Sequence, residues 1–245
     1  QAPTVAIVAI DPSSPFSGGA VLGDRIRMQN HYADPGVYIR SLGTRGHHGG
    51  LSQATREVVL ALDAAGYAII LVETVGVGQT ELEVLDLADT TTVVLVPESG
   101  DSIQVMKAGL MEIADVFAVN KCDRPEADKM ERELTNLVAL NHEMSHASWA
   151  NPVIQTQATS DRGTKALVEA IRAHQKHLAQ SGERHKKARN NVIREAQEIL
   201  LEKTRRQVVQ MFSSGEMDQE IQEVLERKSN PYRLAESLLR RQSES

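Results

Sequence analysis

Short apolar segments recur along the chain, and turn-forming residues bound each of them. Most of their residues are β-branched, and apolar positions follow one another without alternating with polar ones. This pattern predicts strands that are buried on both faces of a parallel sheet. The predicted strands cover residues 5–10, 67–72, 92–96, 116–119 and 153–154.

Amphipathic segments separate these strands, and their apolar residues recur every three or four positions, which predicts helices. In 54–65, Val58, Val59 and Leu62 share one face, and Gly66 follows as a stop signal. The other predicted helices cover 81–88, 103–113, 127–140 and 164–178. Strands alternating with helices form right-handed βαβ units, so we expect an α/β fold with a doubly wound, mostly parallel sheet. A closed α/β barrel needs eight such units, and the chain offers about five or six.

The pattern changes after Gly182. Residues 184–212 read as one long helix, and two shorter helices follow, one around Ile221 and one after Pro231. Such a tail has too few apolar residues to form a core of its own, so it either folds back on the sheet or pairs with a second copy. We predict a sheet domain over 1–182 and a helical arm over 183–245 that forms a homodimer.

Composition narrows the class of protein. Of 245 residues, 41% are hydrophobic and 24% charged, which is typical of a globular chain. A net charge of −6 and an aromatic content of 3% argue against a nucleic-acid binder. The longest aliphatic run, 5–10, is far shorter than the roughly 20 residues of a membrane span. The single cysteine, Cys122, fits a reducing compartment, so we expect a cytoplasmic protein, or one of the mitochondrial matrix in a eukaryote.

The first chemical motif is Asn120-Lys121-Cys122-Asp123, directly after the predicted strand 116–119. A carboxylate at that strand end can accept hydrogen bonds from N1–H and the 2-amino group of guanine. Adenine has no donor at N1, and such a polar mismatch discriminates strongly. Lys121 can lay its methylene stem over the base, and Asn120 can tie neighbouring loops together. The simpler alternative is an Asp that caps the next helix.

A second motif runs from Glu73 to Gln79 (ETVGVGQ), again at a strand end. An acidic residue there can hold magnesium through water, and the backbone N–H of Gly76 can reach a γ-phosphate. The alternative is a plain strand-to-helix turn. A third segment, residues 11–25, begins with Asp11 at a strand end, where ligands bind in open α/β sheets. Its Gly- and Ser-rich loop suits a switch segment or an ordinary surface loop.

In this order, these motifs resemble those of the methylmalonyl-CoA mutase-associated GTPases, the cobalamin metallochaperone family of MeaB, MMAA and ArgK. The resemblance covers nearly the whole chain. Its segments are DPSSPFSGGAVLGDRIRM (11–28), TRGHHGG (44–50), ETVGVGQTE (73–81), a glycine-bounded stretch at 100–109, NKCD (120–123) and NPY (230–232). It implies a P-loop NTPase type of sheet and the cofactors GTP or GDP and Mg²⁺.

The resemblance also assigns roles to individual residues. It places Asp11, Asp24 and Glu73 around the magnesium ion and the γ-phosphate, with Gln79 as a further catalytic candidate. The guanine nucleotide would be bound by Gly76, Asn120, Lys121, Asp123, Gln157, Ala158 and Thr159. The family has Ser where Gln157 stands, and Glu98 and Ser99 replace small residues ahead of the 100–109 segment, which resembles an extra switch facing a mutase.

One family motif does not occur in these 245 residues, the phosphate loop G-x-x-x-x-G-K-[ST]. In the family this loop and its strand precede the strand that opens here near Thr4. Because Gln1 is not Met, we expect that the natural N-terminus, the first strand and the phosphate loop lie upstream. Only with that loop do we expect GTP hydrolysis.

The function we expect is a GTPase that couples hydrolysis to loading or protecting an adenosylcobalamin-dependent acyl-CoA mutase. Two alternatives stay open, a non-hydrolysing module that docks on a mutase and a transport-linked arginine/ornithine kinase-type ATPase. We expect neither nucleic acid nor membrane among the partners.

Overall fold

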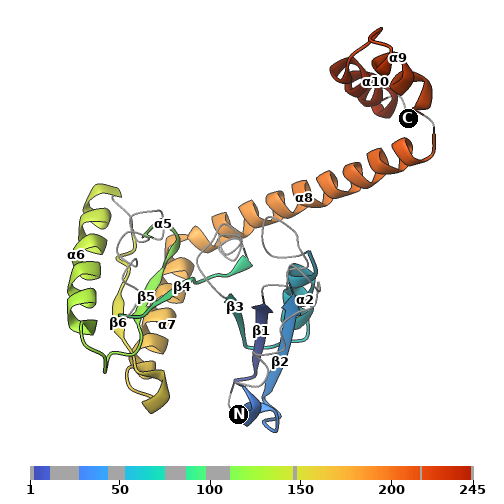
Figure 1. Cartoon of the computed structure of the whole chain (residues 1–245). Helices are drawn as coiled ribbons and strands as arrows, with labels where there is room; N and C mark the ends of the chain where they lie inside the picture. The colour runs from blue at the N-terminus through green and yellow to red at the C-terminus, as the bar shows by residue number, and fades with distance from the viewer. Residues whose placement is uncertain are drawn as a thin grey trace. The chain divides into compact units, whose positions relative to one another are not determined.

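The computed structural model describes residues 3–11, 28–43, 53–74, 87–97, 111–145, 148–215 and 217–243. The chain divides into two compact units, Gln1–Lys187 and Ala188–Ser245. The first unit alternates strands and helices, and the second is helical (Figure 1). The expected α/β class with parallel strand pairing is confirmed.

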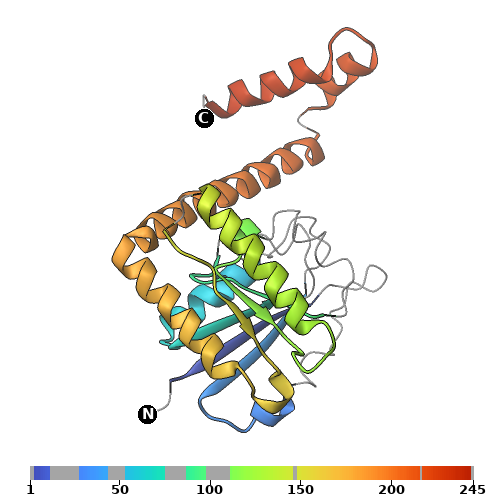
Figure 2. The same ribbon diagram turned by 90° about the vertical axis from the view of Figure 1, so that its left-hand side faces the viewer.

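The first sheet has the strand order β2-β1-β3, with β1 (Val5–Asp11) between β2 (Val37–Gly43) and β3 (Ile69–Thr74). All three strands run parallel and side by side (blue to teal in Figure 2). One face packs against α2 (Gln53–Ala64), where Leu62 meets Ala6 and Val8. A short 3-10 helix, η1 (Gln29–His31), precedes β2.

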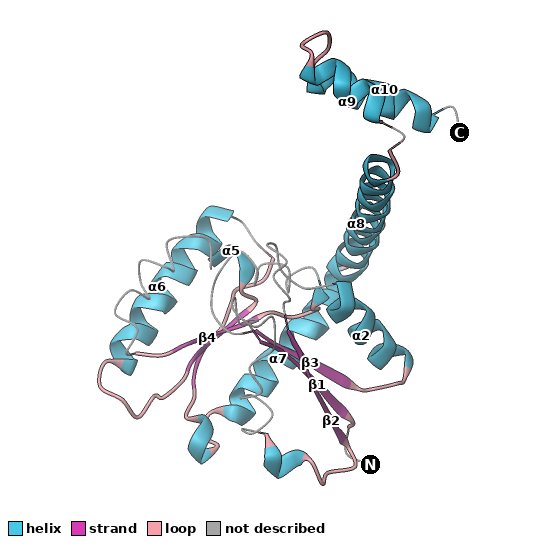
Figure 3. Ribbon diagram, turned by 45° about the vertical axis from the view of Figure 1, so that its right-hand side comes forward, coloured by secondary structure: helices cyan, strands magenta, loops and turns pink. Residues whose placement is uncertain are grey.

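The second sheet has the order β4-β5-β6, with β5 (Val116–Val119) between β4 (Thr92–Leu95) and β6 (Val153–Gln155). Its two faces carry α6 (Ala127–Ser145) and α7 (Thr164–Ser181) (Figure 3). Phe117 and Val119 pack with Leu134 of α6 in the larger core of the molecule. Because both faces are covered, all four residues of β5 are buried. A three-residue helix, α5 (Met111–Ile113), leads into β5.

The expectation that every strand is buried on both faces is wrong for β3 and β4. Ile69 and Leu71 on β3 are 40% and 49% exposed, and Val94 on β4 is 58% exposed. Both are edge strands, since each pairs with one neighbour among the described residues. Of the predicted helices, 81–88 and 103–113 lie almost entirely outside the described residues.

The helical part of the chain follows α7. A single residue, Gly182, separates α7 from α8 (Glu183–Ser213), and its φ of 76° explains why glycine stands there. The second unit adds α9 (Asp218–Leu225) and α10 (Pro231–Ser243), which contact each other. The three helices expected after Gly182 are therefore present. No helix in the described ranges is long and apolar enough to cross a membrane.

Candidate functional site

The loop Asn120–Asp123 follows β5 directly, at the carboxyl end of the second sheet. Two main-chain hydrogen bonds hold it there. Asn120 N donates to the carbonyl of Leu95 on β4 (2.8 Å), and Cys122 N donates to the carbonyl of Thr156 after β6 (3.0 Å). Lys121 adopts a φ of 58°, which is uncommon for a residue with a side chain. The loop is thus anchored to the strands on both sides of β5.

The side chain of Asn120 joins this loop to the one after β6. Its Oδ1 accepts hydrogen bonds from Thr156 Oγ1 and from Ala158 N, each at 3.2 Å. Thr156 is 6% exposed, so Asn120 also satisfies a buried hydroxyl. The tie between neighbouring loops that the sequence suggested for Asn120 is therefore present in the structure.

The second loop, residues 156–163, is closed on itself. Gln157 N donates to the Arg162 carbonyl (2.9 Å), and Arg162 N donates back to the Gln157 carbonyl (3.3 Å). Between them lies a 3-10 turn, η4 (Ala158–Ser160). Gly163 closes the loop with a φ of 80°, and a Cβ added there would lie 2.1 Å from the carbonyl oxygen of Gln155. The chain therefore needs glycine at the point where this loop enters α7.

Four of the residues predicted to bind the guanine base have exposed side chains on these two anchored loops. Asp123 and Lys121 are exposed on the first loop, and Ala158 and Thr159 on the second, while Gln157 is half-buried. These two loops expose a carboxylate and main-chain groups at the carboxyl end of the sheet. Such groups can form hydrogen bonds with the edge of a flat heterocycle and cover its faces. The role of each residue in binding guanine stays a prediction.

Two of the three predicted magnesium residues, Asp11 and Glu73, lie on the first sheet. Glu73 is near the carboxyl end of β3 and pairs in register with Ala9, two residues before Asp11, the last residue of β1. Glu73 is half-buried, and its Oε2 is buried without a hydrogen-bond partner among the described residues. A buried carboxylate oxygen without a partner is costly unless a cation or water occupies it. Glu73 therefore fits a hard divalent cation such as Mg²⁺.

Asp24, Gly76 and Gln79 lie outside the described residues, as do the segments 44–50 and 100–109. In the part of the chain that the structure describes, no group of three His, Cys, Asp or Glu is placed to hold a metal ion. The complete magnesium set Asp11, Asp24 and Glu73 therefore stays a prediction.

Sequence reasoning missed Gln155, Thr156 and Gly163. Gln155 Nε2 donates to Asp128 Oδ1 (2.8 Å) and to Glu131 Oε2 (3.1 Å), which ties the end of β6 to the start of α6. Because Asp128 and Glu131 lie three apart near the start of α6, they face the same side of that helix. For Gln155 and Thr156 the available signal was a pair of polar residues directly after the predicted strand 153–154.

The chain is similar in sequence to several known proteins. The family model described as "Methylmalonyl Co-A mutase-associated GTPase MeaB" matches residues 1–213. A Pyrococcus horikoshii protein named "Putative GTPase" is 46% identical over 236 residues, which are 96% of this chain and 74% of that protein. The "GTPase ArgK" of Escherichia coli is 34% identical over 233 residues (90% of this chain, 66% of that protein).

A mouse protein is also similar, the "Methylmalonic aciduria type A homolog, mitochondrial". It is 36% identical over 186 residues, which are 75% of this chain and 45% of that protein. The family model covers well over half of the chain. The chain belongs to the methylmalonyl-CoA mutase-associated GTPase family, MeaB.

Proposed function

We propose that this protein is a GTPase that couples GTP hydrolysis to loading or protecting an adenosylcobalamin-dependent acyl-CoA mutase. The observation that carries the guanine-nucleotide part is the tie from Asn120 to Thr156 and Ala158, which fixes two loops around one place at the sheet's carboxyl end. The mutase part is supported by the family description and by the name of the mouse relative.

In this proposal Asp123 selects the base. Its carboxylate accepts from N1–H and the 2-amino group of guanine, whereas adenine would place a lone pair against it. Lys121 covers one face of the base with its methylene stem. The main-chain groups of Gln157, Ala158 and Thr159 close the other side, so the replacement of serine by Gln157 has little effect.

Hydrolysis takes place at the carboxyl end of the first sheet. Asp11, Asp24 and Glu73 would hold Mg²⁺, which stabilises negative charge on the phosphates when bound. The N–H of Gly76 donates to the γ-phosphate. Val77 follows it, and its side chain can neither donate to nor accept from water. Gln79, two residues beyond Val77, is our candidate for orienting the attacking water, so we expect slow basal hydrolysis that the mutase accelerates.

The test uses the product of the full coding sequence, because these 245 residues contain no G-x-x-x-x-G-K-[ST] loop. Calorimetry should give much tighter binding of GDP than of ADP, and Asp123→Asn should reduce that preference. Equal affinity of the unmodified protein for both nucleotides would contradict the base assignment.

Single-turnover hydrolysis with and without the cognate mutase tests the coupling. We expect acceleration by the mutase that Gln79→Ala largely removes. A fast basal rate that the mutase leaves unchanged would overturn the coupling. Transfer of labelled phosphate from ATP to arginine would instead support the kinase-type alternative.

We propose that the partner of the arm is a second copy of the chain. Several apolar side chains of the second unit are exposed, including Val192 (65%), Leu200 (65%), Leu201 (69%) and Leu225 (72%). Exposed apolar surface of this kind is typical of protein interfaces. Deleting 184–245 from the full-length protein should convert a dimer to a monomer in light scattering, with GDP binding retained. A truncated protein that stays dimeric would contradict this role.

A further inference from the structure

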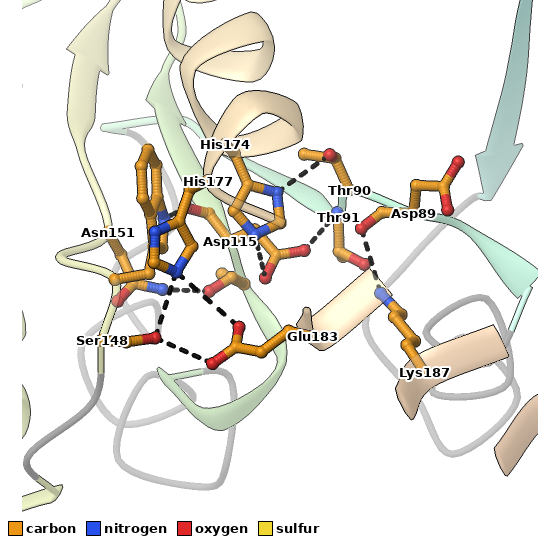
Figure 4. Close-up of polar contacts among 12 residues, drawn as sticks. Asp89, Thr90, Thr91, Asp115, Ser148, Asn151, His174, His177, Glu183 and Lys187 are labelled. Atoms are coloured by element: carbon orange, nitrogen blue, oxygen red, sulfur yellow. Dashed lines mark hydrogen bonds and ion pairs between the residues drawn. The ribbon is translucent and has the colours of Figure 1, made fainter. Parts of the chain in front are cut away.

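A polar cluster around the buried side chain of His174 lies at the amino-terminal ends of β4, β5 and β6, the opposite end of this sheet from Asn120 and Ala158 (Figure 4). It joins the loops that precede these three strands to the end of α7 and the start of α8. We name it the arm-root cluster, and its central members are Asp115, Trp149, His174, His177, Glu183 and Lys187.

His174 is the most buried of these side chains, at 3% exposure. Its Nδ1 lies 2.9 Å from Thr90 Oγ1, and its Nε2 faces Asp115 Oδ1 at 3.4 Å. The other carboxylate oxygen of Asp115 accepts from Thr91 N at 2.7 Å. A carboxylate facing Nε2 favours the tautomer with its proton there, so Nδ1 accepts from the Thr90 hydroxyl. The neutral imidazole is therefore fully partnered.

Trp149 connects this histidine to the next one on α7. Its Nε1 donates to the main-chain carbonyl of Asp115 (2.8 Å), and its ring lies 5.0 Å from that of His174 and 5.3 Å from that of His177. His177 Nε2 in turn lies 3.0 Å from Ser148 Oγ. The last turns of α7 are thus held on the loops before β5 and β6.

The same loops hold the first residues of α8. Ser148 Oγ donates to Glu183 Oε1 (2.8 Å), and Glu183 Oε2 lies 3.7 Å from His177 Nε2. Lys187 Nζ donates to the main-chain carbonyl of Asp89 before β4 (3.1 Å). Lys187 is also the last residue of the first unit. We call residues 183–187 the α8 root.

The groups around His174 shift its pKa in opposite directions. Burial lowers the pKa of its imidazole, because the cation loses hydration, and this outweighs the nearby Asp115 carboxylate, which raises it. Lys187 and His177 lower that pKa further, and Glu183 raises it. From the loop before β4, Asp89 contributes its carbonyl to Lys187. A proton on His174 and the ammonium of Lys187 therefore disfavour each other, and this coupling is reciprocal.

We propose that the arm-root cluster is a proton-sensitive latch, which holds the α8 root on the loops before β4 and β6 while His174 is neutral and releases it when His174 takes up a proton. The proton comes from solvent and binds Nδ1. The Thr90 hydroxyl can then rotate and accept from Nδ1–H, so that hydrogen bond survives. What changes is a positive charge on a buried imidazole that interacts electrostatically with Lys187. Moving the α8 root outward separates the two cations, which outweighs the loss of Glu183 because Lys187 acts more strongly on His174 than Glu183 does. It also admits water to the imidazolium.

The experiment follows the α8 root and His174 separately in the full chain. Hydrogen–deuterium exchange gives the protection of 183–190 from pH 7.5 to 5, after division by the intrinsic exchange rate at each pH. If opening takes up one proton, protection should fall up to about tenfold per pH unit below 6.5, the ordinary His pKa. The fluorescence of Trp149, the one tryptophan in the sequence, should titrate over a lower range, where closed His174 itself takes up its proton.

Matched variants distinguish the latch from general acid sensitivity. Lys187→Met should lower protection of the root at pH 7.5, weaken its pH dependence and move the Trp149 transition to higher pH. Lys186→Met removes the same charge from an exposed neighbouring side chain and should change none of these. His177→Gln should leave a Trp149 transition due to His174, and His174→Asn should abolish the pH dependence of protection.

Three results would overturn the proposal. One is exchange protection of the α8 root that does not change with pH over the range in which the fluorescence of Trp149 changes. Another is an equal effect of the two lysine variants. The third is loss of protection in α6 residues 130–138 together with the root, because that would report global unfolding rather than release of a latch. If His174→Asn does not fold, the lysine pair and the α6 comparison still decide the outcome.

Discussion

Asn120 Oδ1 lies 3.2 Å from the main-chain nitrogen of Ala158, so one carboxamide oxygen joins the loop after β5 to the loop after β6. Asn120→Ala should leave the buried Thr156 hydroxyl without its acceptor. We expect a loss of about 1–2 kcal/mol in the free energy of unfolding, measured by urea denaturation. GDP binding should weaken as well, because the second loop loses its tether.

Asn120→Asp is the control for this tether. Aspartate keeps an oxygen that can accept from Ala158 N and Thr156 Oγ1, so its stability should stay close to that of the unmodified protein. If Asn120→Ala and Asn120→Asp lose the same unfolding free energy, the stability depends on the shape of the Asn120 side chain and not on its role as a hydrogen-bond acceptor.

Gly163 and Gly66 provide a second, matched test. Their φ angles are 80° and 81°, but a Cβ on Gly163 would collide with the Gln155 carbonyl oxygen, whereas a Cβ on Gly66 would meet nothing within 4 Å. Gly66→Ala should cost about 1 kcal/mol of unfolding free energy, for backbone strain alone. Gly163→Ala should cost clearly more, about 2–4 kcal/mol, since the backbone must also shift. Equal costs in thermal or urea unfolding would show that the 156–163 loop adapts freely.

Three strands illustrate how much of the fold could be predicted from the sequence. Strand β5 was predicted with its observed bounds, because Val116–Val119 is apolar throughout and buried throughout. Strand β2 was missed because Arg40 and Ser41 interrupt its apolar residues, and as an edge strand it buries only Ile39. Strand β3 begins two residues later than expected. It also ends two residues later, because Glu73 and Thr74 are polar yet continue the pairing with β1.

The residues of the candidate site were likewise only partly predictable from the sequence. Asn120 could be assigned a tethering role because it begins the motif Asn120–Asp123 directly after a predicted buried strand. Gly163 could not be singled out, since its requirement arises from a carbonyl eight residues earlier that only the folded loop brings close. The arm-root cluster gave no sequence signal either. His174 and Thr90 are 84 positions apart, and a histidine on an amphipathic helix reads as a surface residue until a neighbour covers it.

A negative charge at position 155 should destabilise the fold. Its carboxamide nitrogen donates to carboxylates of Asp128 and Glu131, so Gln155→Glu would place three carboxylates together. We expect this variant to lose about 1 kcal/mol of unfolding free energy at pH 7. The loss should shrink as pH falls toward 4, where carboxylates take up protons. Gln155→Met loses the same hydrogen bonds without the added charge, so its loss should depend on pH less strongly than that of Gln155→Glu. Parallel pH dependence of the two variants in urea denaturation would contradict this reading.

His174 makes the stability of the whole chain depend on pH, and the sign follows from its burial. The pKa of the folded protein's His174 lies below the ordinary value of 6.5, because burial disfavours the imidazolium. The unfolded chain therefore binds more protons than the folded chain between those two values. The stability from neutral His174 is complete above pH 6.5 and is lost as pH falls through the lowered pKa, at no more than about 1.4 kcal/mol per pH unit.

Urea denaturation at pH 7.5 and 5.5 measures this contribution. Other groups titrate in the same range, so the informative quantity is the difference between variants. His174→Asn should lose less stability between the two pH values than the unmodified protein, although it starts from a lower value because Thr90 and Asp115 lose their partner. His185→Asn, at an exposed position on α8, should keep the original pH dependence. If the two variants share one pH dependence, burial of His174 does not control the proton uptake on unfolding, and another histidine must account for it.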